Sequence, residues 1–388
     1  MIKVFTRGIP QNINRRTTVK ILRTPEPFIE KREKHALIIE NILNLTADDL
    51  KGYSLILSSL PSKDLPIPSS QPILHSIEAL DHLNEGDVVM GDAESGIFRT
   101  VYLRGSHQNT IFTTDACNSN CLMCSQPPKE VDSNARLEAI LDEIRLFDTD
   151  TKVMCITGGE PTLMGDNLLK IISECRNLHP SMKLHMLTNG RTFKDEAFAT
   201  KYASILHPDL TAGIPLYSDI DYLHDYVVQA EGAFWETING IHNLGRLGQK
   251  IEIRIVVHKQ TYERLPQLAE FIYRNMPFVN HVTFMGLEIV GYTKANLESL
   301  WIDPFDYQEK LEAAVIRLAR EGMHVSIYNH QLCVLKKNLW KFSRASISDW
   351  KNDYDKECGQ CDAREQCGGF FQWNPTVRSS HITAIHYQ

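Results

Sequence analysis

The chain has 388 residues, of which 43% are hydrophobic and 23% are charged. This composition is typical of a globular protein with a substantial core and excludes disordered and collagen-like proteins. With 41 Lys and Arg against 48 Asp and Glu, the formal charge of −7 argues against a general nucleic-acid binder, which needs a basic face.

The first hundred residues predict a mixed α+β segment. Apolar residues at helical spacing predict a helix over residues 29–45. Residues 86–90 and 97–103 are rich in β-branched and aromatic residues, and residues 91–96 between them predict a hairpin turn. No apolar stretch approaches the ~20 residues that a bilayer requires, and no secretory signal is visible. We therefore expect a cytoplasmic protein with neither a membrane nor a nucleic acid as partner.

From residue 110 onward, short β-rich runs alternate with amphipathic stretches, which is typical of parallel βα units. Strands are predicted at residues 110–114, 153–157, 184–188, 212–217, 251–258 and 282–287, and residues 323–328 could extend the sheet. Helices are predicted at residues 134–147, 167–177, 195–205, 234–245 and 262–275. The prediction is an α/β protein with an open, TIM-like barrel of about six strands. Its expected regions are residues 1–108, 109–305 and 306–388.

Three cysteines, Cys117, Cys121 and Cys124, follow the first predicted barrel strand with the spacing C-x-x-x-C-x-x-C. In a barrel, the loops after the strands carry the catalytic groups. A structural zinc site normally has a fourth ligand close by, whereas three cysteines on a [4Fe–4S] cluster leave one iron free to bind another molecule. A zinc knuckle completed by a distant residue is the alternative at this point.

A second motif, Gly158-Gly-Glu-Pro161, follows the second predicted strand and so belongs to the same edge of the sheet. Two glycines let the backbone approach a ligand closely, and exposed backbone groups there could bind an amine and a carboxylate. The isolated Cys155 and Cys175 are expected to be buried core residues.

In this order and context, the two motifs resemble those of the radical S-adenosylmethionine (radical SAM) superfamily, over roughly residues 109–300. The resemblance implies that Cys117, Cys121 and Cys124 bind a [4Fe–4S] cluster whose open iron holds SAM. In that superfamily, an electron from an external donor cleaves SAM, and the resulting 5′-deoxyadenosyl radical takes a hydrogen atom from the substrate.

The resemblance also implies SAM-binding roles for single residues. Met123 matches the position beside adenine, and Gly158, Gly159 and Glu160 match the stretch at the SAM amino group. Ser218 and Arg254 match positions that often contact the ribose or carboxylate. A salt bridge inside the barrel is an equally good interpretation of Arg254, since structural ion pairs also use arginine.

A second set, Cys358, Cys361 and Cys367, has the spacing C-x-x-C-x5-C in a polar, turn-rich region. On its own, this spacing favours a zinc ribbon. After a radical SAM barrel, it resembles part of the SPASM and twitch extensions, which hold auxiliary [4Fe–4S] clusters. The chain lacks the cysteine that a full SPASM domain has shortly after Cys367, so the resemblance is to a reduced version with one cluster. Cys333 is the candidate for the fourth ligand.

Residues 121–128, the first hundred residues and the C-terminal cysteine set together resemble the HxsC-type maturases of the His-Xaa-Ser repeat peptide system. This resemblance implies that the substrate is a ribosomally made precursor peptide and that a second radical SAM maturase is a partner. The resemblance does not identify a catalytic acid or base. It also does not identify the bond that forms on the substrate, because crosslinking, epimerisation and oxidation all begin with the same radical.

Two other functions stay open on the sequence alone. The first is a radical SAM enzyme acting on a small molecule in cofactor or nucleoside biosynthesis, where twitch-like extensions also occur. The second is a non-catalytic, metal-binding partner subunit. The intact cysteine triplet and residues 158–161 argue against the second, because a scaffold has no need of an open iron and a SAM cradle.

Overall fold

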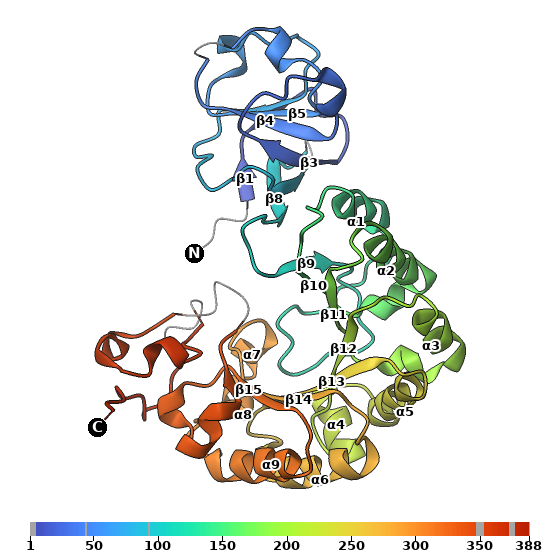
Figure 1. The fold of residues 1–388 in the computed structure, drawn as a ribbon, viewed down its shortest axis with the longest axis vertical. Coiled ribbons are helices and arrows are strands. Elements are labelled where there is room, and N and C mark those ends of the chain that lie inside the picture. Colours follow the sequence, from blue (N-terminus) through green and yellow to red (C-terminus); the bar gives the residue numbers. More distant parts are fainter. Residues whose placement is uncertain (1–4, 43–44, 92–93, 347–352, 372–376, 388) are drawn as a thin grey trace. The chain divides into compact units, whose positions relative to one another are not determined.

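The computed structural model of the chain describes all residues except 1–4, 43–44, 92–93, 347–352, 372–376 and 388 (Figure 1). The chain divides into two compact units. The first contains residues 1–111, 137–154 and 174–182, and the second contains residues 112–136, 155–173 and 183–388.

The first eight strands form one mixed sheet in the order β1-β8-β7-β3-β4-β5-β6-β2. β1 (Phe5–Arg7) pairs with β8, and β2 (Ile9–Gln11) pairs with β6. Because β1 and β2 are two halves of one extended segment, this segment joins both ends of the sheet and closes it into a barrel. Gly8 lies where the segment changes partner, and a Cβ there would lie 2.8 Å from the carbonyl oxygen of His75. The remaining strands are β3 (Thr17–Leu22), β4 (His35–Ile39), β5 (Leu55–Ser58), β6 (Ile73–His75), β7 (Val88–Gly91) and β8 (Ile97–Tyr102).

The segment predicted as a helix over residues 29–45 is mostly not helical. Only η1 (Ile29–Lys31) is a short 3-10 turn, residues 35–39 form β4, and residues 43–44 lie outside the described residues. β4 lies between two other strands and is buried on both faces, so its apolar residues are consecutive. A short apolar run of this kind cannot be told from a buried helix by spacing alone. The predicted hairpin is confirmed, since β7 and β8 pair antiparallel.

The last eight strands form a second sheet in which neighbours in sequence are neighbours in space. The pairings from β11 to β16 are parallel. All six predicted barrel strands are present, and β15 and β16 extend the sheet, which confirms the α/β fold with an open barrel. The strands are β9 (Asn109–Phe112), β10 (Val153–Thr157), β11 (Lys183–Leu187), β12 (Leu210–Pro215), β13 (Lys250–Val257), β14 (His281–Gly286), β15 (Val325–Tyr328) and β16 (Ser343–Arg344).

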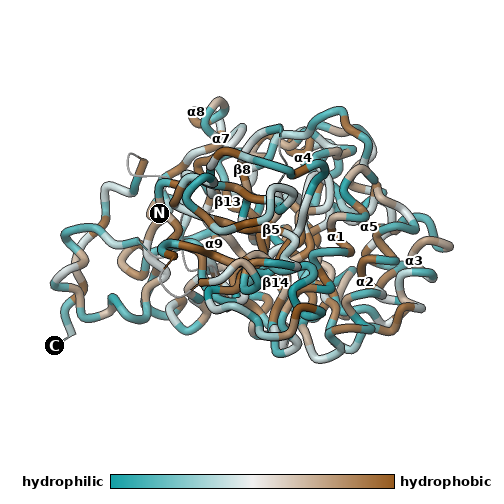
Figure 2. Tube along the Cα trace, turned by 90° about the horizontal axis from the view of Figure 1, so that it is seen from above, coloured by the Kyte–Doolittle hydropathy of each residue, from teal (hydrophilic) through white to brown (hydrophobic). Residues whose placement is uncertain are grey.

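Helices cover the outer side of this sheet, where α3, α5, α6 and α9 follow its curve (Figure 1). Apolar and polar residues alternate along α2, α3 and α5 (Figure 2), as amphipathic helices require. The five predicted helices are present as α1 (Leu137–Ile144), α2 (Asp166–Leu178), α3 (Glu196–Ala203), α5 (Ala233–Arg246) and α6 (Leu265–Asn275). Helices that the sequence analysis missed are α4 (Asp221–Val228), α7 (Tyr292–Ala295), α8 (Leu297–Leu300) and α9 (Gln308–Arg320).

β13 illustrates how the strands position the site. Its isoleucines Ile251, Ile253 and Ile255 are fully buried. Successive side chains of a strand point to opposite faces, so the alternate residues Arg254 and Val256 share the other face, where both line a cavity.

Candidate active site

A cavity of about 380 Å³ lies where strands of the second sheet end and their loops begin. Its walls include Cys117, Cys121 and Cys124 from the loop after β9. Five of the six residues predicted to bind SAM also line it, namely Met123, Gly158, Gly159, Glu160 and Arg254. The fold therefore brings together two motifs that are more than thirty residues apart in the sequence.

The three thiols of this first set are partly buried. Burial raises the pKa of Cys117 to about 11 and that of Cys121 to about 12. The thiols therefore keep their protons at neutral pH unless a nearby cation stabilises the thiolates, as a bound metal centre does. Within the described part of the chain, no three His, Cys, Asp or Glu side chains lie close enough to hold a single metal ion.

The cysteine loop, residues 115–125, is held on one side by α4 and by the segment that begins α7. The amide nitrogens of Asn120 and Leu122 donate to the last two carbonyl oxygens of α4, at 3.0 Å each. The side-chain nitrogen of Asn296 donates to the carbonyl oxygen of Leu122 at 2.8 Å. Gly291 has φ +56°, and a Cβ there would lie 2.2 Å from the carbonyl oxygen of Cys124. These contacts leave the loop little room to move.

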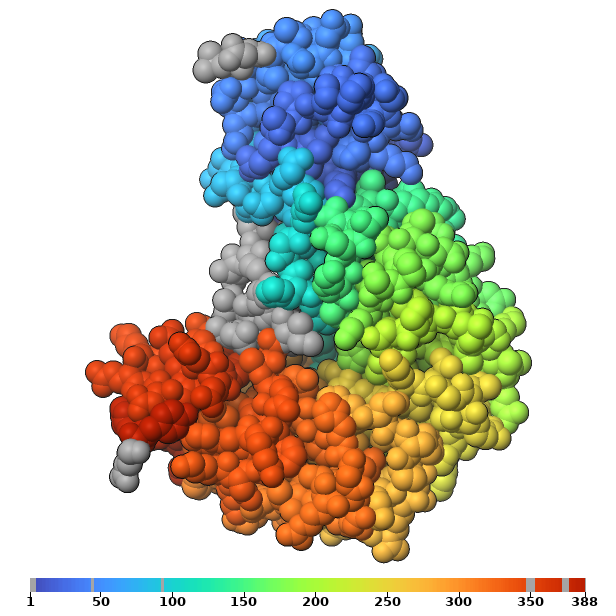
Figure 3. Space-filling model, in the orientation of Figure 1, coloured from blue at the N-terminus to red at the C-terminus, as the bar shows by residue number. Residues whose placement is uncertain are grey.

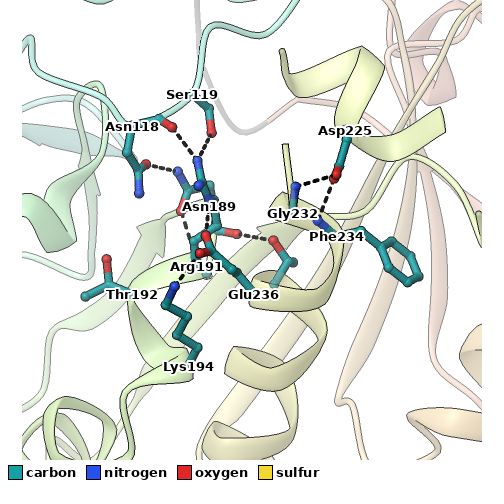
Figure 4. Close-up of polar contacts among 12 residues, drawn as sticks. Asn118, Ser119, Asn189, Arg191, Thr192, Lys194, Asp225, Gly232, Phe234 and Glu236 are labelled. Carbon is teal, nitrogen blue, oxygen red and sulfur yellow. Dashed lines mark hydrogen bonds and ion pairs between the residues drawn. The ribbon is translucent and has the colours of Figure 1, made fainter. Parts of the chain in front are cut away.

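On its other side, the cysteine loop is held by residues that follow β11 (Figure 4). The guanidinium of Arg191 donates to the carbonyl oxygen of Asn118 and to the Ser119 hydroxyl, the latter at 3.0 Å. The side-chain nitrogen of Asn189 donates to Oδ1 of Asn118 at 2.6 Å. Glu236 on α5 holds Arg191 through its Nε at 2.7 Å. The sequence analysis did not identify Arg191, whose contacts lie about seventy residues away in the chain.

The glycine motif fits closely against the start of the cysteine loop. A Cβ at Gly159 would lie 2.2 Å from the carbonyl oxygen of Ala116. The amide nitrogens of Gly159 and Glu160 donate to the carbonyl oxygens of Thr114 and Ala116, at 2.6 and 2.8 Å. Because Gly159 is not among the positive-φ glycines, this position requires glycine for space and not for backbone conformation.

The carboxylate of Glu160 is fully enclosed by donors from the protein. It accepts from the Thr162 amide and hydroxyl at 3.0 and 2.7 Å, from the Thr188 hydroxyl at 2.6 Å, and from the Asn189 amide at 2.6 Å. Burial raises the pKa of Glu160, and these four hydrogen bonds oppose that rise. Glu160 thus joins the loop after β10 to the loop after β11. The contact with the SAM amino group that the resemblance implies stays a prediction.

Ser218 does not line the cavity. It is fully buried, and its hydroxyl accepts a hydrogen bond from the amide of Ile220 at 3.1 Å, just before α4. Its predicted contact with SAM stays a prediction. The preceding residue, Tyr217, lines the cavity instead. Burial, and then the nearby Cys121 and Cys124, raise the pKa of Tyr217, so the phenol is neutral at physiological pH.

Arg254 lines the cavity and is also paired inside the barrel, and its predicted contact with SAM stays a prediction. Its Nη1 lies 3.3 Å from both carboxylate oxygens of Glu252, which is 5% exposed. Nε2 of His185 lies 2.5 Å from Oε2 of the same carboxylate. Gly213 makes room for this group, since a Cβ there would lie 2.9 Å from His185 Nε2 and 3.0 Å from Arg254 Cδ.

The second cysteine set surrounds a small cavity of its own, in the C-terminal segment that appears as a red lobe in Figure 3. Cys333, the proposed fourth ligand, lies in the wall of this cavity together with Cys358, Cys361 and Cys367. Backbone amides point at two of the sulfurs, from Leu332 to Cys367 at 3.4 Å and from residue 385 to Cys361 at 3.3 Å. Four thiols, two of which accept N–H···S contacts, form a suitable donor set for an iron–sulfur cluster. Whether they bind one stays a prediction.

The two isolated cysteines are core residues, as expected. Cys155 on β10 is 6% exposed and Cys175 on α2 is 0% exposed. No helix that the structure describes combines the length and apolar character needed to cross a membrane.

Residues 111–272 match the family described as the radical SAM superfamily. The Fe-coproporphyrin III synthase of Methanosarcina barkeri is 27% identical over 165 residues, which are 41% of this chain and 39% of that protein. The GTP 3′,8-cyclase of Petrotoga mobilis is 25% identical over 205 residues, which are 50% of this chain and 60% of that protein. The match thus spans less than two thirds of either relative.

Similar solved structures include SuiB of Streptococcus suis bound to S-adenosylmethionine, with a TM-score of 0.47 and 20% identity over 57% of this chain and 50% of SuiB. Another is anSMEcpe with bound AdoMet and the Cp18Cys peptide, with a TM-score of 0.44 and 15% identity over 57% of this chain and 62% of that protein.

Proposed function

We propose that this chain, which belongs to the radical SAM superfamily through residues 111–272, modifies a ribosomally made peptide of the His-Xaa-Ser repeat type by hydrogen-atom abstraction. One observation carries the enzymatic part: three cysteines, two glycines and Arg254 line a single cavity at the mouth of the barrel. The peptide as substrate rests on the resemblance of residues 121–128 and of the C-terminal cysteine set to HxsC-type maturases.

The residues present fit the cofactors of the superfamily. Cys117, Cys121 and Cys124 would hold a [4Fe–4S] cluster, and the tight backbone approach at Gly159 leaves the cavity side of that loop free of side-chain bulk. Met123 and Arg254 would contact SAM. When bound, the cluster and SAM supply one-electron chemistry that yields a hydrogen-abstracting radical.

The chain's own residues position and shield these groups. Tyr217, Met123 and Val256 form an apolar part of the wall, which excludes water from a reactive intermediate. Glu252 orients the Arg254 guanidinium at the cavity wall, where it would stabilise the carboxylate of SAM. The cysteine loop is held on both sides, so the thiols keep their places during turnover.

An auxiliary [4Fe–4S] cluster at Cys333, Cys358, Cys361 and Cys367 belongs to the same proposal. The enclosed position of the four thiols supports it. A second radical SAM maturase and an external electron donor are the proposed partners.

A second candidate function is the modification of a small molecule. It is favoured by the similarity to a GTP 3′,8-cyclase, at 25% identity over half of this chain. In that case the substrate would be nucleotide-sized and contained within the barrel mouth.

One experiment separates the two functions. Anaerobically reconstituted protein is incubated with SAM, a reductant and either a synthetic peptide of His-Ala-Ser repeats or GTP, and products are analysed by mass spectrometry. We expect a mass change in the peptide together with 5′-deoxyadenosine, and neither product with a Cys121→Ala variant. Conversion of GTP with an unchanged peptide would establish the second function instead.

A further inference from the structure

Two further hollows lie beside the cavity with the first cysteine set, in the same unit of the chain. This cavity shares Gly286, Leu287 and Asn329 with a second cavity, which lies between the ends of β13 to β15 and residues 370–371 and 377–379. The second cavity shares Trp301, Ile302 and Val377 with a third, open groove of about 790 Å³. The three hollows are therefore neighbours along a line of shared wall residues, which we call the track.

The outer groove offers contacts of several kinds. Leu297, Trp301 and Ile302 form an apolar wall. The groove is also lined by Lys294 and Asp306, and no hydrogen bond or ion pair among the described residues involves the ammonium of the first or the carboxylate of the second. An apolar wall with charges of both signs can take up an extended peptide, whose side chains alternate in direction.

The groove is connected to the chemistry by the segment that forms its wall. α7 and α8 follow β14 closely, and the same segment contacts the cysteine loop through Tyr292 and Asn296. A ligand in the groove therefore lies next to the segment that holds the first cysteine set.

We infer that this groove binds the residues of an extended peptide substrate that flank the modified residue, with Trp301 at the entrance to the inner cavities. The inference rests on the proposed function. Size supports a peptide over a small molecule: the cavity with the first cysteine set, at about 380 Å³, is already within the roughly 300–1,000 Å³ that holds a whole small ligand, and the open groove of about 790 Å³ is additional room. A nucleotide-sized substrate would leave it empty.

The test compares two lengths of one probe. The affinity of the reconstituted protein with SAM is measured for a His-Ala-Ser tripeptide and for a longer peptide of His-Ala-Ser repeats. We expect the longer peptide to bind more tightly, and Trp301→Ala to weaken its binding by about tenfold, as loss of an aromatic contact does. Tripeptide affinity should stay within about twofold, because the tripeptide does not reach the groove.

Trp235→Ala is the matched control. Trp235 lies on α5, is 57% exposed and lines none of the three hollows, so its loss should leave both affinities unchanged. A second measurement does not depend on the folding of a variant. A longer peptide with a terminal benzoylphenylalanine should crosslink, in the wild-type protein, to the fragment containing residues 294–302.

The outcomes separate the inference from the function on which it rests. If the longer peptide binds but Trp301→Ala has no effect and the crosslinks lie elsewhere, the groove inference is overturned and the proposed function stands. If the wild-type protein binds neither peptide, the proposal of a peptide substrate is wrong, and the groove inference, which depends on it, is overturned as well.

Discussion

Arg191 connects helix α5 to the cysteine loop by hydrogen bonds. Its guanidinium donates to Asn118 and Ser119 of the loop and is held in place by Glu236 (Figure 4). Lys194 pairs with the same glutamate but does not contact the loop. The two cations therefore share one anion, and only one of them positions the cysteines.

Arg191→Met should loosen the cysteine loop. Hydrogen bonds from a buried charge contribute about 1.5–3 kcal/mol, so the amides of Asn120 and Leu122 should exchange their hydrogens faster, and the reconstituted protein should retain less iron. Lys194→Met removes the other partner of Glu236 and should change neither measurement. Equal exchange rates in the two variants would show that Arg191 only stabilises the fold.

Gly159→Ala should displace the cysteine loop. The added Cβ would lie 2.2 Å from the carbonyl oxygen of Ala116, which is backbone and has no alternative rotamer. We expect lower iron content and weaker SAM binding, measured by iron analysis and calorimetry. Gly105→Ala is the control, because no atom lies within 4 Å of its Cβ position. Unchanged iron content in Gly159→Ala would contradict this account, because it would mean that the cysteine loop can accommodate the added Cβ without being displaced.

At the scale of the elements, alternation of strands and helices was enough to predict the barrel. Each βα unit has a strand buried among its neighbours followed by an amphipathic helix, and both patterns are local in sequence. The error over residues 29–45 has a local cause too: β4 is buried on both faces, so it lacks the alternation that identifies a half-exposed strand.

Most of the site could be predicted where its residues form motifs, and Arg254 was identified only through the resemblance. The cysteines and residues 158–161 were found because each set is compact in sequence. Asn296 and Gly291, which hold the cysteine loop from the far side, lie about 170 residues from it and are ordinary residues in their own segments. Only the parallel order of the strands brings them to the same edge of the sheet.

The carboxylate of Glu252 on strand β13 stabilises the fold by an amount that depends on pH. Burial raises the pKa of Glu252, but the hydrogen bond from His185 and the charge of Arg254 lower it to about 2, well below the usual value of 4.5. A lowered folded-state pKa stabilises the fold above about pH 4.5, and this contribution is lost as the pH falls toward 2.

Glu252→Gln should therefore lower the free energy of unfolding at pH 7 by on the order of 3 kcal/mol. The difference from the wild-type protein should shrink as the pH falls below 4.5, as measured by urea unfolding. Glu231→Gln replaces an exposed glutamate and should have almost no effect. A difference that is independent of pH down to 3 would contradict the ion-pair account.

At the scale of the whole molecule, both cysteine sets and the track belong to one compact unit. The second cavity shares Asn329 with the first cysteine cavity and Gln331 with the C-terminal one. The second cavity thus lies between the two cysteine sets. The closed barrel of the other unit has both ends of its sheet joined, which removes free edges for strand addition.

The most direct test of the account measures iron and 5′-deoxyadenosine in the same samples. Anaerobically reconstituted wild-type protein should contain about eight irons, from two [4Fe–4S] clusters, and should form 5′-deoxyadenosine from SAM and a reductant. With Cys117, Cys121 and Cys124 changed to alanine, about four irons should remain and no 5′-deoxyadenosine should form. With Cys358, Cys361 and Cys367 changed instead, iron should again fall to about four. Undiminished 5′-deoxyadenosine formation by the variant without the first three cysteines would contradict the central claim.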